Sequence, residues 1–257
     1  MPMATEHSNG GFQLRTLENG WCGGKFAALD ALSVPHLVTT FNGPDVQTIK
    51  THTYRAGVQV ARVLACKDAA FLDQVHGARV LIGAQRGLIG AGDGLATGTP
   101  GLLLVGKSAD CPLILVADPR ARAVGFAHAS WRATVAGVTS QLIQTMETRW
   151  GCRPADLVAC ICPSVGPECF EVGPEVRAAA LREIGPHATA FFQPGPRKEH
   201  FDLWLANGDA LQRCGLVPDN IHVAGLCTLC QDQHFPSYRG EGANAGRFIA
   251  AIGIAQA

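Results

Sequence analysis

The chain has 257 residues, of which 47% are hydrophobic and 16% are charged, so it is long and apolar enough to bury a sizeable core. Its 21 basic and 21 acidic residues cancel, which argues against a nucleic-acid or anionic-membrane protein and favours small-molecule chemistry. No Pro- or Gly-rich linker divides the chain, and we expect a single domain over residues 1–257, with residues 1–34 as an N-terminal extension.

The start of the chain is polar and carries no apolar signal segment, and no later run is long and apolar enough to span a bilayer. We therefore expect a cytoplasmic protein, in which the ten cysteines stay largely reduced. Cys160, Cys162, Cys227 and Cys230 could form a structural zinc site, although the Cys-x-Cys spacing is tighter than in ordinary zinc ribbons.

The first candidate site residue along the chain is His76, which precedes a predicted strand at residues 78–82. The adjacent Gly77 lets the backbone bend or approach a ligand there. A histidine can ligate a metal, but an isolated one is more often structural. Residues 83–101 are rich in glycine and are predicted to form a loop that shapes a cleft.

Residues 101–108 satisfy the P-loop pattern Gly-x-x-x-x-Gly-Lys-Ser letter for letter. The four positions between the two glycines are large and apolar, which is typical of a buried strand, and Pro112 interrupts the helix that should follow a P-loop. We therefore predict a strand here and no site for ATP or GTP.

Two apolar runs, residues 113–118 and 122–127, are predicted to pair as an antiparallel hairpin. The connector at residues 118–121 begins Asp-Pro, as a type I turn does, and proline excludes the primed two-residue turns. A four-residue loop places Cys111 opposite His128, about 5 Å apart at Cβ and within reach of one ion. A one-residue bulge would separate them, and the alternative is a buried Cys111 beside a hydrogen-bonded core His128.

Apolar residues recur at helical spacing from Ser130 to Trp150, so a helix is predicted to begin directly after His128. The free N–H groups of a helix start bind anions, and Arg132 in the first turn adds a bidentate donor, unless it is an ordinary surface arginine. A catalytic zinc takes three protein ligands and keeps a fourth position for water or substrate. His76 is the best candidate for the third ligand.

The rest of the chain alternates strands and helices. Strands are predicted at residues 157–161, 221–226 and 247–254, and helices at residues 173–184 and 202–214. Gly185 and Gly215 stand in helix-stop positions, and Asp202 is expected to cap the second of these helices.

Six motifs occur in order from His76 to the C-terminus: Gln74-Val75-His76-Gly77, Gly92-Asp93-Gly94-Leu95-Ala96-Thr97, Ala109-Asp110-Cys111-Pro112, His128-Ala129-Ser130-Trp131-Arg132, Gly166-Pro167 with Cys169-Phe170-Glu171-Val172-Gly173, and Ser237-Tyr238-Arg239 with Gly246-Arg247. Together they resemble the motifs of the YfiH-type purine nucleoside phosphorylases, a family formerly called the polyphenol oxidase or laccase-domain family.

The resemblance implies an α+β fold, a four-layer αββα sandwich with mixed sheets. It also implies a Zn²⁺ ion held by His76, Cys111 and His128, the same ligands that the hairpin argument reached. The implied activity is phosphorolysis of adenosine, inosine and S-methyl-5′-thioadenosine, with some adenosine deamination. Phosphate would be bound by Arg132, with Arg239 and Arg247 as the remaining cations of the C-terminal motif, and Cys111, His128 and Arg132 would be the catalytic residues.

Departures from the family pattern bear on the substrate. Ser130 and Ala133 stand where the family has glycines around the Trp-Arg pair, so the backbone approaches a ligand less freely, although Ser130 could cap the helix instead. The N-terminal segment at residues 35–40 lacks the arginine expected nearby, which puts any substrate contact from it in doubt.

Two other functions fit parts of the sequence. A copper-dependent polyphenol oxidase follows from the older family name, because a His/Cys site can accept Cu²⁺, but the nine histidines contain no His-x-His pair of the kind found in multicopper laccases. A cysteine hydrolase would use Cys111 as nucleophile and His128 as its base. Metal content separates the three.

Overall fold

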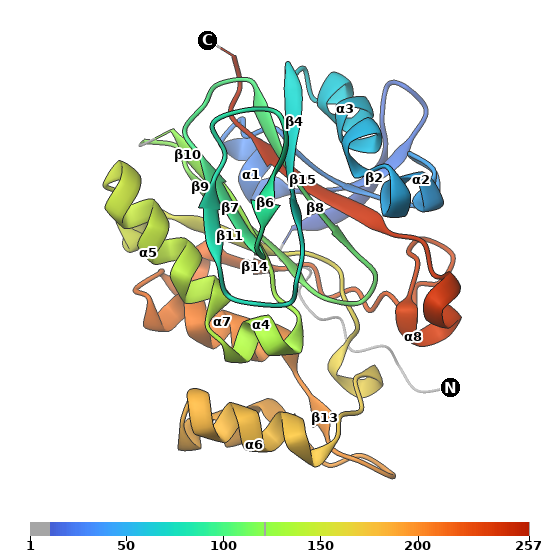
Figure 1. Ribbon diagram of the computed structural model, residues 1–257, viewed down its shortest axis with the longest axis vertical. Helices are drawn as coiled ribbons and strands as arrows, with labels where there is room; N and C mark the ends of the chain where they lie inside the picture. The colour runs from blue at the N-terminus through green and yellow to red at the C-terminus, as the bar shows by residue number, and fades with distance from the viewer. Residues whose placement is uncertain (1–10, 121, 257) are drawn as a thin grey trace.

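The computed structural model describes residues 11–120 and 122–256, which form two mixed β-sheets packed face to face between helices (Figure 1). The first sheet has the strand order β1 (Phe12–Thr16), β2 (Cys22–Phe26), β3 (His36–Thr39), β15 (Phe248–Gly253), β8 (Leu102–Ser108), β4 (Asp68–Asp73), β6 (Gly87–Ala91). The second has the order β14 (Ile221–Val223), β11 (Val158–Ile161), β9 (Leu113–Asp118), β10 (Ala123–His128), β7 (Gly94–Thr97), β5 (Val80–Ile82). The expected fold with mixed sheets is confirmed.

Eight α-helices lie among the described residues: α1 (Ala27–Ala31), α2 (Val46–Thr51), α3 (Thr53–Val63), α4 (Trp131–Val135), α5 (Val138–Trp150), α6 (Pro174–Glu183), α7 (Leu203–Arg213) and α8 (Tyr238–Glu241). Short 3₁₀ turns occur at Pro154–Asp156 (η1), Pro167–Cys169 (η2), Pro186–Phe191 (η3), Pro218–Asn220 (η4) and Gly242–Asn244 (η5), and a small ribbon joins β12 (Phe192–Gln193) to β13 (His200–Phe201). None of the helices in the described part of the chain is long and apolar enough to cross a membrane.

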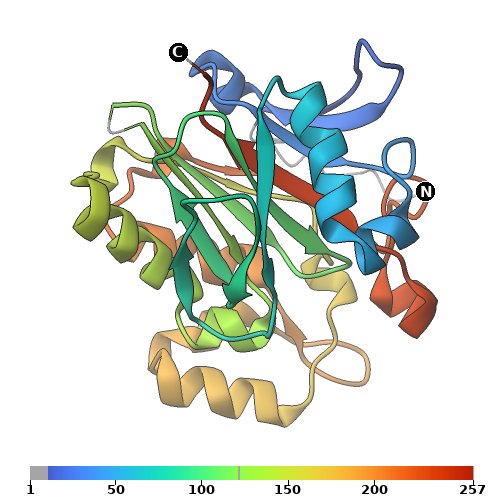
Figure 2. The ribbon, with the colours of Figure 1, turned by 45° about the horizontal axis from the view of Figure 1, so that its top comes forward.

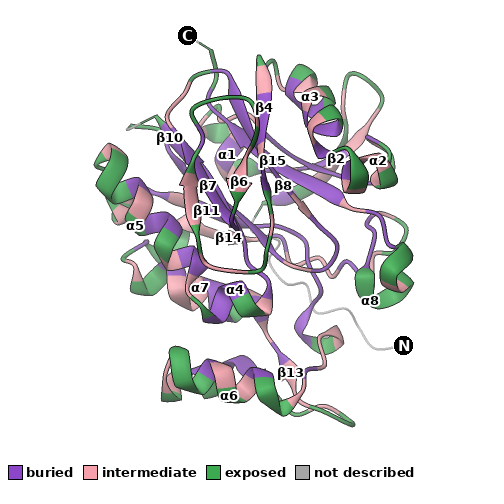
Figure 3. Ribbon diagram, in the orientation of Figure 1, coloured by how far each residue is buried: buried purple, intermediate pink, exposed green. Residues whose placement is uncertain are grey.

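Three apolar cores separate the layers. Alternate residues of β9 and β10, such as Leu113 and Phe126, point into the core between the sheets, while Ile114 and Ala127 pack against α5 and α7 on the outer side. A third core joins α2 and α3 to the outer face of the first sheet. Figures 1 and 2 show the two helix pairs on opposite sides of the sheets, and in Figure 3 the central strands between them are mostly buried. The layers therefore run helix, sheet, sheet, helix.

Burial on both faces explains why the strand signal is strongest in the apolar runs. Every residue of β9 is buried, and β9 has the predicted bounds. The P-loop-like segment is strand β8, as predicted, and it lies in the interior of the first sheet. The glycine-rich stretch predicted as a loop instead contains β6, a partly exposed edge strand, and β7, a buried strand of only four residues, and neither provides a long apolar run.

The N-terminal region also differs from the expectation. Residues 12–26, which we assigned to an extension, form β1 and β2 and pair with β3 at the edge of the first sheet. Residues 1–10 lie outside the described residues.

The predicted hairpin exists, but its register is shifted by two residues. Leu113, and not Cys111, pairs with His128, and Asp118 pairs with Ala123. The strands therefore close around residues 119–122, one position later than predicted; Ala121 within this loop lies outside the described residues. A shift of two residues keeps every side chain on its original face, so Cys111 and His128 still face the same side.

The predicted single helix after His128 is broken into α4 and α5. Gly137 separates them with a φ of +83°, a conformation that glycine adopts at little cost. The Ser130 hydroxyl accepts a hydrogen bond from Ala133 N at 3.2 Å and caps α4, as the departure from the family pattern allowed.

We expect Phe126→Ala to reduce the free energy of unfolding by about 3–5 kcal/mol, because it removes a fully buried ring from the core between the sheets and leaves a cavity. Urea unfolding followed by circular dichroism measures this loss. Phe41→Ala is the control, since the Phe41 side chain is 42% exposed. Equal losses for the two variants would contradict the assignment of this core.

Candidate active site

A cavity of about 570 Å³ opens at one end of the core between the two sheets. It contains all six predicted site residues, and its lining is Gln74, His76, Lys107, Ser108, Ala109, Asp110, Cys111, His128, Ser130, Trp131, Arg132, Val165, Phe170, Leu203, Tyr238, Arg239 and Arg247. Its volume suits a small organic molecule. The fold thus brings together residues that lie up to 171 positions apart, between His76 and Arg247.

Cys111 and His128 meet at the open end of the hairpin. Cys111 lies two residues before β9, where its carbonyl accepts a hydrogen bond of 2.6 Å from Ser108 Oγ. His128 ends β10 and is 4% exposed. Its ring also lies edge-on to the ring of His76, with the centroids 5.0 Å apart.

Asp93 holds the two histidines in place. One of its carboxylate oxygens bonds His128 Nδ1 at 2.8 Å and accepts from His76 N at 3.0 Å, and the other accepts from Gly77 N at 2.7 Å. His76 has a φ of +62°, which is uncommon for a residue other than glycine, and these bonds stabilise that conformation. Asp93 itself is fully buried at the start of β7.

The pKa values follow from these contacts. Burial lowers the pKa of His76, and the neighbouring His128 lowers it further, so its neutral form is favoured. For His128, burial opposes the charged form, but the hydrogen bonds to Asp93 and Cys111 outweigh it and raise the pKa to about 9. For Asp93, burial alone would raise the pKa, but its bonds to His128 and the Gly77 backbone place it below the ordinary value.

The donor set fits a zinc ion in its chemistry. Two imidazoles and a thiolate are zinc ligands, and a ligating histidine usually bonds a carboxylate through its other ring nitrogen, as His128 does with Asp93. Among the described residues, however, the group whose three ligand atoms all lie within 4.8 Å of one another is Cys169, Cys227 and Cys230. A single ion shared by His76, Cys111 and His128 therefore stays a prediction.

Four cationic side chains line the cavity: Lys107, Arg132, Arg239 and Arg247. None of them takes part in an ion pair with the carboxylates in the described part of the chain. Their charge is therefore available to an anion. Helix α4 has only five residues, so the cations, rather than a helix dipole, make the cavity attractive to phosphate.

Neighbouring groups hold these cations in place. Lys107 Nζ donates to Thr53 Oγ1 at 2.9 Å, and burial lowers its pKa. Arg247 Nη1 donates to the backbone oxygens of Ala245 and Gly246 at 3.0 and 2.6 Å. Arg239 Nη2 donates to the backbone oxygen of Glu171 at 2.6 Å.

Asp110 is an anchor of the cavity wall. Its two carboxylate oxygens accept from Thr228 Oγ1 and Arg239 N, both at 2.7 Å, and its backbone oxygen accepts from Val165 N. Its φ of +89° departs from ordinary strand geometry, so the strand does not continue regularly through it. Asp110 thus ties its own segment to those of Val165 and Arg239, which also line the cavity, and to Thr228 outside the lining.

Aromatic rings complete the lining. Trp131, Phe170 and Tyr238 reach the cavity from three separate segments, and the Tyr238 side chain is 54% exposed. The Arg239 guanidinium lies 4.6 Å from the centre of the Phe170 ring. Such rings stack on flat heterocycles, and the arginine leaves a charge beside them.

The structure adds Lys107 and Asp93 to the predicted residues. Lys107 is the lysine of the misleading P-loop pattern, and only the pairing of β8 with β15 brings it near Arg247. Asp93 belongs to a family motif quoted above, but its partners His76 and His128 are distant in sequence. The predicted cap is confirmed, since Asp202 Oδ1 accepts from Leu205 N at 2.9 Å.

The four-cysteine zinc site is wrong. Cys160 and Cys162 are fully buried in the core between the sheets. They alternate with Ile161 at the end of β11, and this alternation directs both side chains to the inner face of the sheet. Cys227 and Cys230 meet Cys169 instead.

The chain is similar in sequence to known proteins. Residues 43–255 match the family described as multi-copper polyphenol oxidoreductase laccase. A purine nucleoside phosphorylase of Deinococcus radiodurans is 37% identical over 200 residues, covering 78% of this chain and 76% of that protein. An adenosine deaminase, RL5, from an unknown prokaryotic organism is 32% identical over 161 residues, 62% of this chain and 61% of that protein.

The fold has a close match among solved structures. The crystal structure of the hypothetical protein YfiH of Bacillus licheniformis superposes with a TM-score of 0.81 at 27% sequence identity. The match covers 90% of this chain and 96% of that one.

Proposed function

The chain belongs to the YfiH-type family, described as multi-copper polyphenol oxidoreductase laccase, and from this premise we propose that it is a zinc-dependent purine nucleoside phosphorylase. Its substrates would be adenosine, inosine and S-methyl-5′-thioadenosine, with an adenosine deaminase side activity. The observation that carries the proposal is the single cavity in which His76, Cys111 and His128 face four unpaired cations. The names of the Deinococcus and RL5 relatives support both reactions.

Different side chains of the cavity would bind different parts of the substrates. The cations Lys107, Arg132, Arg239 and Arg247 would bind phosphate, and the rings of Phe170 and Tyr238 would hold the purine. Holding phosphate beside the ribose makes the attack effectively unimolecular. An oxygen of hydrogen phosphate would bond to the anomeric carbon while the bond to the purine nitrogen breaks, and the purine would leave with the proton that the phosphate gives up.

His76, Cys111 and His128 would hold the metal ion, with Asp93 orienting His128. When bound, such an ion supplies Lewis-acid polarisation and, for deamination, a water of lowered pKa. The remaining work of binding and orienting the substrate falls to the cations and rings.

The direct test is product analysis. Pure metal-replete protein with adenosine and phosphate should yield adenine and ribose 1-phosphate by chromatography, and inosine by deamination. Omitting phosphate should abolish adenine release and leave inosine formation. If the metal-replete protein formed neither adenine nor inosine, the proposal would be overturned.

Lys107→Met is expected to raise KM for phosphate about 10–100-fold, because it removes one charge-assisted hydrogen bond worth about 1.5–3 kcal/mol. The methionine keeps the length of the side chain, so the wall of the cavity is preserved. Initial rates at varied phosphate measure the effect. Lys67→Met is the control, since Lys67 is exposed and does not line the cavity. An unchanged KM in the Lys107 variant would remove Lys107 from the phosphate site.

The contact between Cys111 and His128 also fits the cysteine hydrolase, in which His128 would deprotonate the thiol. That enzyme would stay active without metal and would lose activity stoichiometrically with iodoacetamide. A copper oxidase would contain several copper atoms per chain. Metal analysis and alkylation of the metal-free protein therefore decide among the three.

A further inference from the structure

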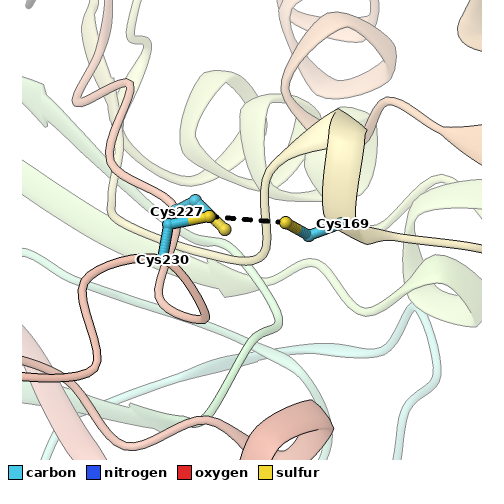
Figure 4. A group of neighbouring side chains, drawn as sticks. All are labelled: Cys169, Cys227 and Cys230. Carbon is cyan, nitrogen blue, oxygen red and sulfur yellow. Dashed lines mark hydrogen bonds between the residues drawn. The ribbon is translucent and has the colours of Figure 1, made fainter. Parts of the chain in front are cut away.

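A cluster of three cysteine sulfurs lies outside the cavity lining. The Sγ atoms of Cys169, Cys227 and Cys230 all lie within 4.8 Å of one another, and those of Cys169 and Cys230 are 3.4 Å apart. Figure 4 shows the three side chains facing one another across two chain segments, the turn η2 and the turn that follows β14. None of the three lines the cavity described above.

The backbone holds the two segments together independently of the thiols. Thr228 N donates to Ser164 O at 2.9 Å, and Ser164 N donates to Leu226 O at 3.2 Å. Gly166 lies so close to Cys227 that an added Cβ would be 3.1 Å from the Cys227 Cβ. These backbone contacts therefore place the cysteine-bearing segments next to each other without any bond between the thiols.

One backbone hydrogen bond already orients a sulfur of the cluster. Gly166 N donates to Cys227 Sγ at 3.1 Å, as outer-shell donors do to the ligands of metal sites. An ion bound among the sulfurs would replace the thiol protons, because a coordinating thiol is deprotonated outright.

The spacing suits a small soft ion. Zinc binds sulfur at about 2.3 Å, which places two sulfurs of one tetrahedral site about 3.8 Å apart. The separation of 3.4 Å between Cys169 and Cys230 is near this value. Cys230 is exposed, so an ion can enter from solvent and keep a water or exchange ligand on that side.

We propose that Cys169, Cys227 and Cys230 form a second metal site, which binds a thiophilic d¹⁰ ion, Zn²⁺ or Cu⁺, through three thiolates. Binding releases the thiol protons to solvent and involves no change in oxidation state. The site is separate from His76, Cys111 and His128, and it does not depend on the proposed phosphorylase activity.

An ion in this cluster would stabilise part of the cavity wall. Cys169 precedes Phe170, and Cys227 precedes Thr228, which donates to Asp110 in the cavity wall. An ion that joins the two segments would fix the Phe170 ring and its contact with Arg239. We expect the ion to protect this wall of the cavity against thermal unfolding.

Metal titration of the full chain tests the proposal. Protein stripped of metal under a non-thiol reductant is titrated with Zn²⁺, and separately with Cu⁺, against a coloured chelator for each ion. The Cys169→Ser/Cys230→Ser variant should bind one ion fewer per chain than the wild type. Cys22→Ser, a control outside the cluster, should match the wild type, and Cys111→Ala should keep the ion bound by the cluster.

A second measurement on the unaltered protein avoids any folding defect of the variant. Alkylation followed by peptide mapping should show Cys169, Cys227 and Cys230 protected together when Zn²⁺ or Cu⁺ is added, while Cys22 reacts at an unchanged rate. Whichever ion protects at lower concentration is the one the site prefers. Equal metal binding by variant and wild type without shared protection would overturn the proposal. So would a Cys169–Cys230 disulfide whose reduction creates no metal binding.

Discussion

Cys111→Ala is expected to lose the metal ion of the cavity and to lower kcat/KM for adenosine phosphorolysis about 10³-fold. A Lewis acid in the active site is worth several kcal/mol, and about 4 kcal/mol corresponds to this factor. Cys111 is a suitable ligand to remove, because its side chain is small and only partly buried, so its truncation leaves little cavity. Metal content and initial rates, measured on the same preparation, give the result.

Cys214→Ala is the matched control for this variant, since Cys214 is also partly buried but follows the last residue of α7, outside the cavity lining. It should retain full metal content and activity. A Cys111→Ala variant that keeps its metal and its rate would remove Cys111 from the site. A variant that keeps its metal but loses activity would favour the nucleophile role instead.

Asp93→Asn is expected to lower the metal affinity of the cavity about 10–100-fold and to cost about 1–3 kcal/mol of stability. The buried carboxylate accepts hydrogen bonds on both oxygens, from His128 on one and from Gly77 N and Val75 N on the other. An amide group has only one acceptor atom, so its NH₂ would face backbone donors. The rare backbone conformation of His76 would lose support at the same time.

Chelator competition and thermal unfolding separate the two effects of this substitution. Asp219→Asn is the control, since Asp219 is exposed on η4. A stability loss without any change in metal affinity would show that Asp93 supports the fold but does not orient the ligands. Unchanged values for both would contradict the hydrogen bonds described here.

The apolar strands could be predicted because their burial is nearly complete. β9 has the predicted bounds, and β11 and β15 differ by only one residue at one or both ends. Continuous apolar runs of this kind are typical of strands covered on both faces. Where strands lie at a sheet edge, as β6 does, the sequence carries little apolar signal and the prediction fails.

The hairpin register illustrates a different limit. The loop begins and ends one residue later than predicted: Asp118 still belongs to β9, and the loop includes Arg122, which has a φ of +49°. An arginine rarely adopts this conformation, so the presence of Arg122 in the sequence does not indicate it. The strands close one position later for this reason. Because the resulting shift is two residues, it preserves the shared face of Cys111 and His128.

Local sequence reasoning found the part of the site that lies on adjacent elements, whereas Arg239 and Arg247 were found through the family resemblance. Cys111, His128 and Arg132 lie at the open end of one hairpin and on the helix that follows it. Lys107 enters the cavity only because β8 pairs with β15, and Asp93 joins His76 to His128 across distant segments. Nothing local in the sequence predicts these contacts.

Anomalous X-ray diffraction from crystals of the metal-replete protein, recorded on both sides of the zinc absorption edge, tests the central claim most directly. We predict an anomalous peak within about 2.0–2.3 Å of His76, Cys111 and His128 together, in the cavity that also holds the four cations. The absence of a peak at these three side chains in active, metal-replete protein would contradict it.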